Sequence, residues 1–206
     1  MKTYDVFLEY YEKIVRWINS PLEEEVGFLT EKIKEKTNKN NRLELACGTW
    51  EVAAELIKNW FNVTGLDISE NMVERAKMNL PEDKIILWDM TNFDLKQQFS
   101  SILCNYNSIC HLLEWSHWQN CFEMTHKHLE DEGIFIFDIN TTFEFESITK
   151  DFKSFYTFWD DSVCLEMFKK NWIYEWLINI FKKAPDWRYD LIQEVVKENS
   201  FPIKII

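Results

Sequence analysis

The stretch Arg42-Leu-Glu-Leu-Ala-Cys-Gly-Thr-Trp-Glu51 decides the fold that we expect for this chain. Residues 42–46 form a short apolar run typical of a buried strand, and residues 51–60 carry apolar side chains at helical spacing. Gly48 lies in the tight turn between them. The N-terminus of a helix offers unpaired N–H groups, and glycine lets a ligand approach the backbone. The stretch therefore predicts a nucleotide-type binding loop at residues 44–50.

Short apolar runs and helical patterns alternate on both sides of this loop. Further strands are predicted at residues 62–66, 84–88, 101–104 and 134–139, and further helices at residues 4–17, 22–36, 70–79 and 115–129. Ser69 is the predicted N-cap of the helix at 70–79, and Pro81 follows its end. The alternation predicts an α/β fold, in which crossover helices connect the strands of a parallel sheet.

The pattern changes after Asn140. Residues 152–158, 163–168 and 172–181 are predicted to be extended, residues 186–199 to be a helix and residues 202–206 to be a last strand. We expect a single domain with an N-terminal helical layer, a binding core, a small β-rich cap and a C-terminal helix and strand. These parts are assigned to residues 1–40, 41–140, 141–185 and 186–206.

Composition narrows the class of protein. The formal net charge of −12 disfavours a nucleic-acid partner, because phosphate contacts need clustered Lys and Arg. No apolar run reaches the roughly 18 residues of a membrane span, and the first residues lack a signal-peptide layout. Five cysteines without a CxxC spacing predict neither a disulfide framework nor a metal site. We expect a cytoplasmic monomer or homodimer without a membrane partner.

Two acidic residues at later strand ends strengthen the interpretation of the loop. Asp67 ends the second predicted strand, where an acidic residue about 20 positions downstream can hydrogen bond ribose hydroxyls. Asp89-Met90 follows the third strand, where a carboxylate can accept from an adenine amino group and a methionine can pack on the ring. As alternatives, Asp67 could cap the next helix and Asp89 could be a turn residue.

A family resemblance follows from these motifs. Residues 43–49, 63–69, 89–95 and 129–140 resemble, in order and spacing, successive motifs of class I S-adenosylmethionine (SAM) dependent methyltransferases of small bacterial type. The resemblance implies a Rossmann-like, doubly wound, mostly parallel sheet of seven-stranded type. It also implies methyl transfer from the cofactor SAM to a small-molecule acceptor. The alternative is a degenerate methyltransferase fold that acts as a non-catalytic binding or regulatory protein.

The resemblance also implies roles for particular residues. The methionine part of SAM is expected to contact Glu44, Ala46, Cys47 and Gly48, and the ribose is expected to contact Asp67. The adenosine is expected to pack against Ile68 and Met72, and the adenine to lie between Asp89 and Met90. Asn105 and Tyr106 are expected under the sulfonium. Tyr11 is similar to a tyrosine that closes over SAM in relatives. No metal ligand is implied.

The sequence departs from the family pattern at three places. Trp50 stands where the family usually has glycine, so its indole must turn outward or crowd the site. Ser100 replaces a common aspartate. The standard fold ends with a further antiparallel strand, so either residues 172–181 take that place or the strand is absent.

Catalysis of methyl transfer needs little dedicated chemistry. Proximity and exclusion of water supply most of the effect in an in-line displacement, and a general base is needed only when the acceptor must lose a proton. Tyr106 and His111 are the candidate catalytic residues, with His111 as the base because histidine titrates near neutrality. The alternative for His111 is a histidine packed on a helix face. His117, His126 and His128 are expected at the surface, and the aromatic cap at 141–181 favours a small, partly apolar acceptor.

Overall fold

The computed structural model describes residues 7–18, 21–78, 84–149 and 152–206. The chain forms two compact units, each containing one β-sheet. The parallel unit comprises Val15–Ile109 and Glu114–Ile139, and the antiparallel unit comprises Met1–Ile14, Cys110–Leu113 and Asn140–Ile206. None of the described helices is both long enough and apolar enough to cross a membrane.

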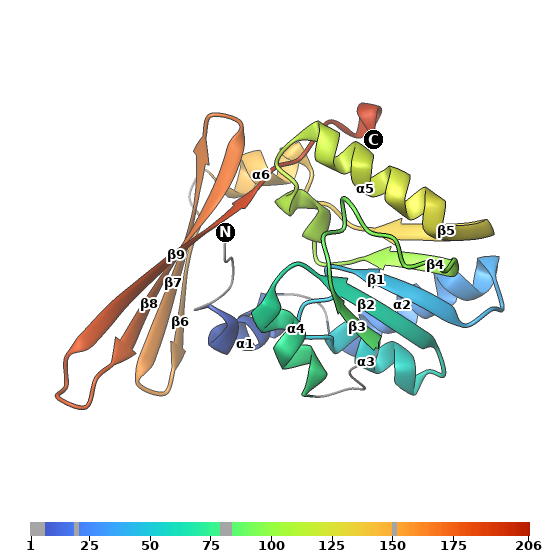
Figure 1. Ribbon diagram of the computed structural model, residues 1–206. Helices are drawn as coiled ribbons and strands as arrows, with labels where there is room; N and C mark the ends of the chain where they lie inside the picture. The colour runs from blue at the N-terminus through green and yellow to red at the C-terminus, as the bar shows by residue number, and fades with distance from the viewer. Residues whose placement is uncertain (1–6, 19–20, 79–83, 150–151) are drawn as a thin grey trace. The chain divides into compact units, whose positions relative to one another are not determined.

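The parallel unit is built on a five-stranded sheet in the order β3-β2-β1-β4-β5 (Figure 1). Its elements are α2 (Leu22–Lys36), β1 (Asn41–Leu45), α3 (Glu51–Lys58), β2 (Asn62–Asp67), α4 (Glu70–Lys77), β3 (Ile85–Leu87), β4 (Phe99–Cys104), α5 (Trp115–His128) and β5 (Leu129–Phe137). Every neighbouring pair of strands is parallel. The α/β class and the parallel sheet are confirmed, whereas the expected seven-stranded count is wrong.

Helices cover both faces of this sheet. Ile136 packs against the buried cluster that contains residues of α2 and α3. Phe135 and Phe137, the neighbours of Ile136 on β5, place their rings 6.3 and 5.7 Å from Phe122 of α5. Because successive side chains of a strand point to opposite faces, α2 and α3 cover one face and α5 covers the other. These contacts of β5 show that the sheet is covered by helices on both faces, as in a doubly wound fold.

The predicted elements of this unit are reproduced with shifted ends. Ser69 caps α4 as expected, because its hydroxyl accepts a hydrogen bond from the backbone N–H of Met72. Asn79 and Pro81, at the predicted end of that helix, and Tyr4, at the predicted start of the first helix, lie outside the described residues. The helix predicted at 22–36 has the bounds of α2.

The antiparallel unit contains a four-stranded sheet in the order β6-β7-β8-β9 (Figure 1). Its elements are α6 (Thr142–Ile148), β6 (Lys153–Phe158), β7 (Asp161–Lys170), β8 (Ile173–Lys183), β9 (Tyr189–Glu198) and the short 3-10 helix at Ile203–Ile205, together with the first residues of α1 (Leu8–Ile18). Phe7, Tyr10 and Ile14 pack with Val163 and Ile178 in a buried cluster. The hydroxyl of Tyr10 donates to Asp161 Oδ2 at 2.8 Å.

Two expectations for the C-terminal part are wrong. Residues 186–199 contain strand β9 rather than a helix, because β9 pairs with β8 along its whole length, which satisfies the backbone groups that face β8. Residues 202–206 contain a 3-10 helix rather than a strand. Of the two alternatives for the further antiparallel strand, its absence from the parallel sheet holds, because residues 173–181 lie in β8 of the second sheet. Helix α6 was not predicted, although Thr141 and Glu144 form a capping box at its start.

Candidate functional site

The order of the parallel strands indicates at which edge of the sheet a ligand binds. The chain runs outward from β1 through β2 to β3 and then returns to place β4 on the other side of β1. In such sheets ligands bind at the carboxyl ends of the strands where the direction reverses. Glu44 on β1 is in register with Leu103 on β4 and with Gly65 on β2. The residues after these strands, the loop at 46–50, Asn105 and Asp67, therefore share one edge.

The loop after β1 is held in a tight conformation by its backbone. Ala46, Gly48 and Trp50 all have positive φ angles, of 51°, 54° and 78°. The N–H of Cys47 donates to the carbonyl oxygen of Leu66 at 3.0 Å, and the N–H of Trp50 donates to the carbonyl oxygen of Cys47 at 2.9 Å. These bonds offset the strain of left-handed backbone at residues other than glycine. The predicted binding loop is thus present as a turn between β1 and α3.

Asp67 joins this loop to the start of α4. Its Oδ2 accepts from the N–H of Gly48 at 2.8 Å, and its Oδ1 accepts from the N–H of Ser69 at 2.8 Å. The N-cap of α4 is Ser69, so Asp67 does not cap the helix itself. A carboxylate oxygen can accept more than one hydrogen bond. The ribose role of Asp67 stays a prediction.

Glu44 and Asn105 are buried polar side chains at the same edge. Glu44 is 3% and Asn105 is 7% exposed, and neither Glu44 Oε2 nor Asn105 Nδ2 has a hydrogen-bond partner among the described residues. Burial raises the pKa of Glu44 to about 8, and the nearby Asn105 amide lowers it in part, although it is not placed for a hydrogen bond of good geometry. An unpaired buried polar group costs about 1–3 kcal/mol. Both atoms therefore suit a ligand with its own donor and acceptor groups.

Tyr106 introduces a carboxylate that the sequence analysis missed. Burial raises the pKa of Tyr106 far above its usual value, and the charge of Glu25, on α2, raises it further. The next residue, Asn107, donates its backbone N–H to both oxygens of Asp138, an exposed residue, at 3.1 Å. Glu25 was overlooked because three successive glutamates in a first helical turn look like a solvated helix start.

The residues expected around the adenosine differ in their surroundings. Asp89 Oδ1 accepts from both the N–H and the hydroxyl of Thr91 at 2.7 Å, so Asp89 does stabilise a turn, as the alternative proposed. Met90 and Met72 are buried, whereas Ile68 is exposed. Their contacts with adenine stay predictions. Burial is the main cause that raises the pKa of the Cys47 thiol, and the nearby charges of Asp67 and Glu44 raise it further. The Cys47 thiol therefore stays protonated and does not act as a nucleophile.

The indole of Trp50 does not behave as expected. Trp50 is only 1% exposed and belongs to the apolar cluster that includes Val52, Leu56 and Val63, so it does not turn outward. It packs on Gly65, where an added Cβ would lie 1.8 Å from Trp50 Cζ3. The expectation of an outward or crowding indole is therefore wrong: the side chain turns into the core, in the space left by a residue without a side chain.

The serine at position 100 is accommodated by local hydrogen bonds. Its hydroxyl donates to the carbonyl oxygen of Asn41 at 2.8 Å, and it accepts a hydrogen bond from the buried guanidinium of Arg42. Arg42 also lies over the ring of Phe61, 4.6 Å from its centroid. Position 100 is at the start of β4, so it supports the sheet rather than the binding edge.

His111 and Tyr11 belong to the antiparallel unit. His111 Nδ1 lies 3.4 Å from the carbonyl oxygen of Lys197, and Nε2 lies 3.8 Å from Glu198 Oε1. Tyr11 packs edge-on against Phe7, with 6.0 Å between the ring centroids. Both residues therefore have contacts within the antiparallel unit, and their roles towards a cofactor stay predictions.

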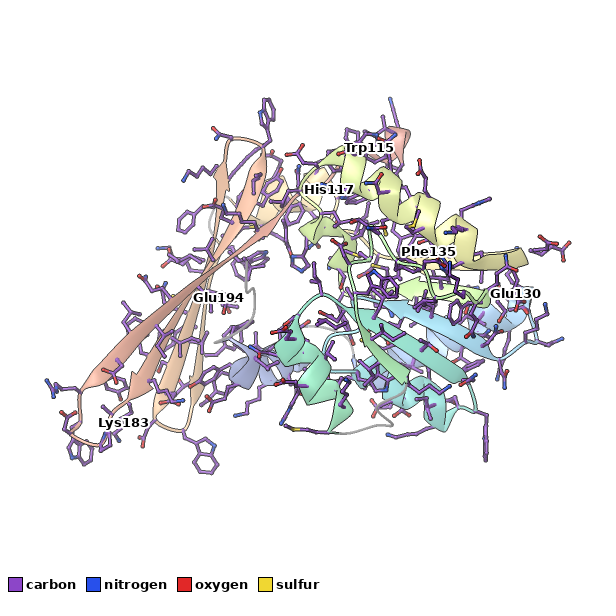
Figure 2. All side chains as sticks on the ribbon, viewed as in Figure 1. Trp115, His117, Glu130, Phe135, Lys183 and Glu194 are labelled. Atoms are coloured by element: carbon purple, nitrogen blue, oxygen red, sulfur yellow. The ribbon has the colours of Figure 1, made fainter. Side chains whose placement is uncertain are left out.

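The other histidines divide between surface and core. His117, near the start of α5, is exposed as expected (Figure 2). His126 is exposed as well. His128 is only 2% exposed, so the expectation of a surface position is wrong. Its Nδ1 lies 2.7 Å from the carbonyl oxygen of Met124, its Nε2 accepts from the N–H of Leu95 at 3.1 Å, and its ring lies 4.5 Å from that of Phe93. It closes the connection before β4.

Comparisons with known proteins agree with this geometry. Residues 43–133 match the model of a family described as "Methyltransferase domain". A protein of Geobacillus sp. (strain WCH70), provisionally named a methyltransferase, is 24% identical over 98% of this chain and 84% of its own length. These matches indicate a methyltransferase domain over residues 43–133, somewhat less than half of the chain.

Two further similar proteins extend the comparison. A SAM-dependent methyltransferase of Clostridium acetobutylicum shares its fold, with a TM-score of 0.82 at 22% identity over 98% of this chain and 83% of that one. The dTDP-3-amino-3,4,6-trideoxy-alpha-D-glucopyranose N,N-dimethyltransferase of Streptomyces venezuelae is 28% identical over 46% of this chain and 40% of its own length. The latter match lies within less than half of either protein.

The polar groups of the binding edge fit SAM. The amino-acid end of SAM carries an ammonium group and a carboxylate, which complement the unpaired Glu44 Oε2 and Asn105 Nδ2. Ribose hydroxyls can donate to a carboxylate such as that of Asp67. The fit thus rests on orphaned polar atoms of the chain itself.

Proposed function

We propose that this methyltransferase transfers the methyl group of SAM to a small-molecule acceptor, with an amine nitrogen as the acceptor atom. The observation that carries the cofactor half is the buried, unpaired pair Glu44 Oε2 and Asn105 Nδ2 beside Asp67, where the strand order reverses. The acceptor half is supported by the Streptomyces venezuelae relative, whose name states methylation of the amino group of a nucleotide-linked sugar.

Each residue of the edge has a proposed task. Glu44 and Asn105 hold the amino-acid end of the cofactor, Asp67 holds the ribose, and Asp89 with Met90 borders the adenine. When bound, SAM supplies an electrophilic methyl group. Since the reaction consumes the positive charge on sulfur, the chain need not stabilise a developing anion. Its contribution is to orient the acceptor and exclude water.

The proton of an amine acceptor needs a destination. We assign it to His111, since an imidazole nitrogen can act as a general base. Glu198, with Oε1 3.8 Å from His111 Nε2, is placed to stabilise the imidazolium that results. Tyr106 is assigned to the cofactor edge, where it lines the site rather than taking a proton, because its raised pKa keeps the phenol neutral.

A non-catalytic role finds no support in the loop. That alternative required the Trp50 indole to occupy the cofactor's place, and the indole is instead packed on Gly65 in the core.

Isothermal titration with SAM and with S-adenosylhomocysteine tests the cofactor half directly. We expect both ligands to bind, and Asp67→Ala to weaken SAM by at least about tenfold, which corresponds to about 1.4 kcal/mol. Asp131→Ala, on an exposed position of β5, is the matched control and should leave the affinity unchanged. Absence of binding at millimolar ligand would refute the enzyme function. Methyl transfer to a panel of small amines and alcohols then tests the acceptor half, and transfer confined to alcohols would overturn the choice of nitrogen.

A further inference from the structure

The turn that follows β4 has an unfavourable backbone conformation. Tyr106 and Asn107 are consecutive residues with positive φ angles, of 57° and 56°. Side chains disfavour this left-handed region, and a bulky residue such as tyrosine tolerates it less well than asparagine does. A residue in such a conformation persists only where the surrounding structure holds it, and such residues cluster at functional sites. The hydrogen bonds of this turn therefore identify the groups that hold it.

Asp138 holds the turn from the neighbouring strand. The N–H of Asn107 donates to both oxygens of the Asp138 carboxylate at 3.1 Å. Cys104 on β4 is in register with Phe137 on β5, and the N–H of Asp138 donates to the carbonyl oxygen of Cys104 at 3.4 Å. The pairing of the two strands thus places the Asp138 carboxylate beside the turn. Asp138 is itself exposed, so its side chain adds little to the core.

Asn105 begins the same turn, and its carbonyl group is fixed as well. Its carbonyl oxygen accepts from the N–H of Ser108 at 3.2 Å and from the hydroxyl of Ser108 at 2.6 Å. The Asn105 side chain is 7% exposed, and its Nδ2 has no hydrogen-bond partner among the described residues. A buried donor without a partner is unfavourable until a ligand supplies an acceptor. The turn thus fixes the backbone around an amide group that a ligand can complete.

We propose that Asp138 is a positioning residue for SAM. Its carboxylate accepts the hydrogen bond from Asn107, keeps the turn in its left-handed conformation and so orients the Asn105 amide towards the amino-acid end of the cofactor. Asp138 acts through the turn rather than by its charge on the cofactor. This inference rests on the proposed cofactor site and adds to it a residue at the end of β5 that has no assigned role there.

The test is the affinity of the full chain for SAM, measured by isothermal titration. Asp138→Ala removes the acceptor for the N–H of Asn107. We expect it to weaken SAM by about tenfold, because a side chain that contacts a ligand loses its orientation when its support is removed. Asp138→Asn keeps an oxygen that can accept this hydrogen bond, so its affinity should stay within about threefold of the wild type. The matched control is Asp131→Ala, at an exposed aspartate of β5, which should leave the affinity unchanged.

A double-mutant cycle shows whether Asp138 acts through Asn105. Asn105→Ala should itself weaken SAM by about tenfold, because it removes the donor that the cofactor would pair. Adding Asp138→Ala should then weaken SAM by less than about threefold more, because the amide that Asp138 orients is already absent. Losses that multiply in the double variant would show that the two residues act independently, and the inference would be overturned.

The remaining outcomes separate this inference from the proposed function. If Asp138→Asn binds SAM as weakly as Asp138→Ala, the carboxylate acts by its charge and the positioning role is overturned. An unchanged affinity in Asp138→Ala also overturns it and leaves the cofactor site intact. Absence of binding by the wild-type chain overturns the proposed function and this inference together. Circular dichroism shows whether each variant is folded, and Asp138→Leu, which also lacks an acceptor, takes the place of Asp138→Ala if that variant is unfolded.

Discussion

Replacing Gly65 by alanine should strongly destabilise the parallel unit, because the methyl group would meet the indole of Trp50. The added Cβ would lie 1.8 Å from Trp50 Cζ3, 2.7 Å from Cε3 and 2.8 Å from Cys47 Sγ. Carbon atoms in contact prefer about 3.5–4.0 Å, so the indole or strand β2 must move by roughly 2 Å. Since Trp50 is almost wholly buried, no open space receives it.

The magnitude follows from the cost of overpacking. Extra methyl groups in a packed core usually cost about 1–3 kcal/mol, and the short contact places Gly65→Ala at about 3 kcal/mol. Trp50→Gly should itself cost about 3–5 kcal/mol for the cavity, less about 1 kcal/mol of relieved left-handed strain at its φ of 78°. In that background the alanine methyl enters the cavity, so Gly65→Ala should cost less than about 1 kcal/mol, a coupling of about 2 kcal/mol.

Urea unfolding followed by far-ultraviolet circular dichroism measures the four corners of this cycle. Gly27→Ala is the matched control: an added Cβ there meets nothing within 4 Å, and α2 should gain about 0.5–1 kcal/mol from the better helix former. Equal costs of Gly65→Ala with and without Trp50 would refute the packing account. So would a Gly65→Ala variant as stable as the wild type.

Three further results are expected. Burial raises the pKa of Glu44 to about 8, so the unfolded chain loses this proton at lower pH than the folded chain, and the contribution of Glu44 to folding stability falls between about pH 4.5 and pH 8. Glu44→Gln should remove that part of the decline in the free energy of unfolding, measured with urea across this pH range. An unchanged pH slope in the variant would contradict this expectation. His128→Ala should cost about 1–3 kcal/mol in unfolding free energy by leaving the buried N–H of Leu95 unpaired, whereas the exposed His126→Ala should change it by less than about 0.5 kcal/mol. SAM binding at pH 7 should release protons from Glu44, seen as a titration heat that depends on the ionisation enthalpy of the buffer; identical heats in phosphate and Tris would show that Glu44 stays protonated.

The parallel unit could be predicted because its signals are local. Each of its buried strands is a short apolar run, and each following helix has its own periodicity or cap, as at Ser69. Strand ends alone were enough to bring Glu44, Asp67 and Asn105 to one edge, because the topology of a doubly wound sheet determines which ends meet.

The antiparallel unit could not be predicted in the same way. Leu191, Ile192, Val195 and Val196 have a spacing that fits a helix as well as a strand with apolar side chains on both faces. Pairing with β8, for example of Val196 with Trp176, decides between them, and such pairing joins positions that no local window contains. The same limit applies to Trp50, whose inward turn depends on the missing side chain of Gly65, and to Glu25, which looks like its exposed neighbours.

The division of the chain between the two units has a consequence for its synthesis. The chain passes from one unit to the other four times, after Ile14, Ile109, Leu113 and Ile139. On the ribosome the parallel unit has all its residues once Ile139 has emerged, and it can fold while β6 to β9 are still being made. The apolar side of α1 cannot pack so early, because its partners are made later. Asp161, which Tyr10 contacts, follows it by 151 positions, so it is synthesised on the order of ten seconds later at usual rates of translation. A chaperone that covers the first helix during this interval would protect the nascent chain from aggregation.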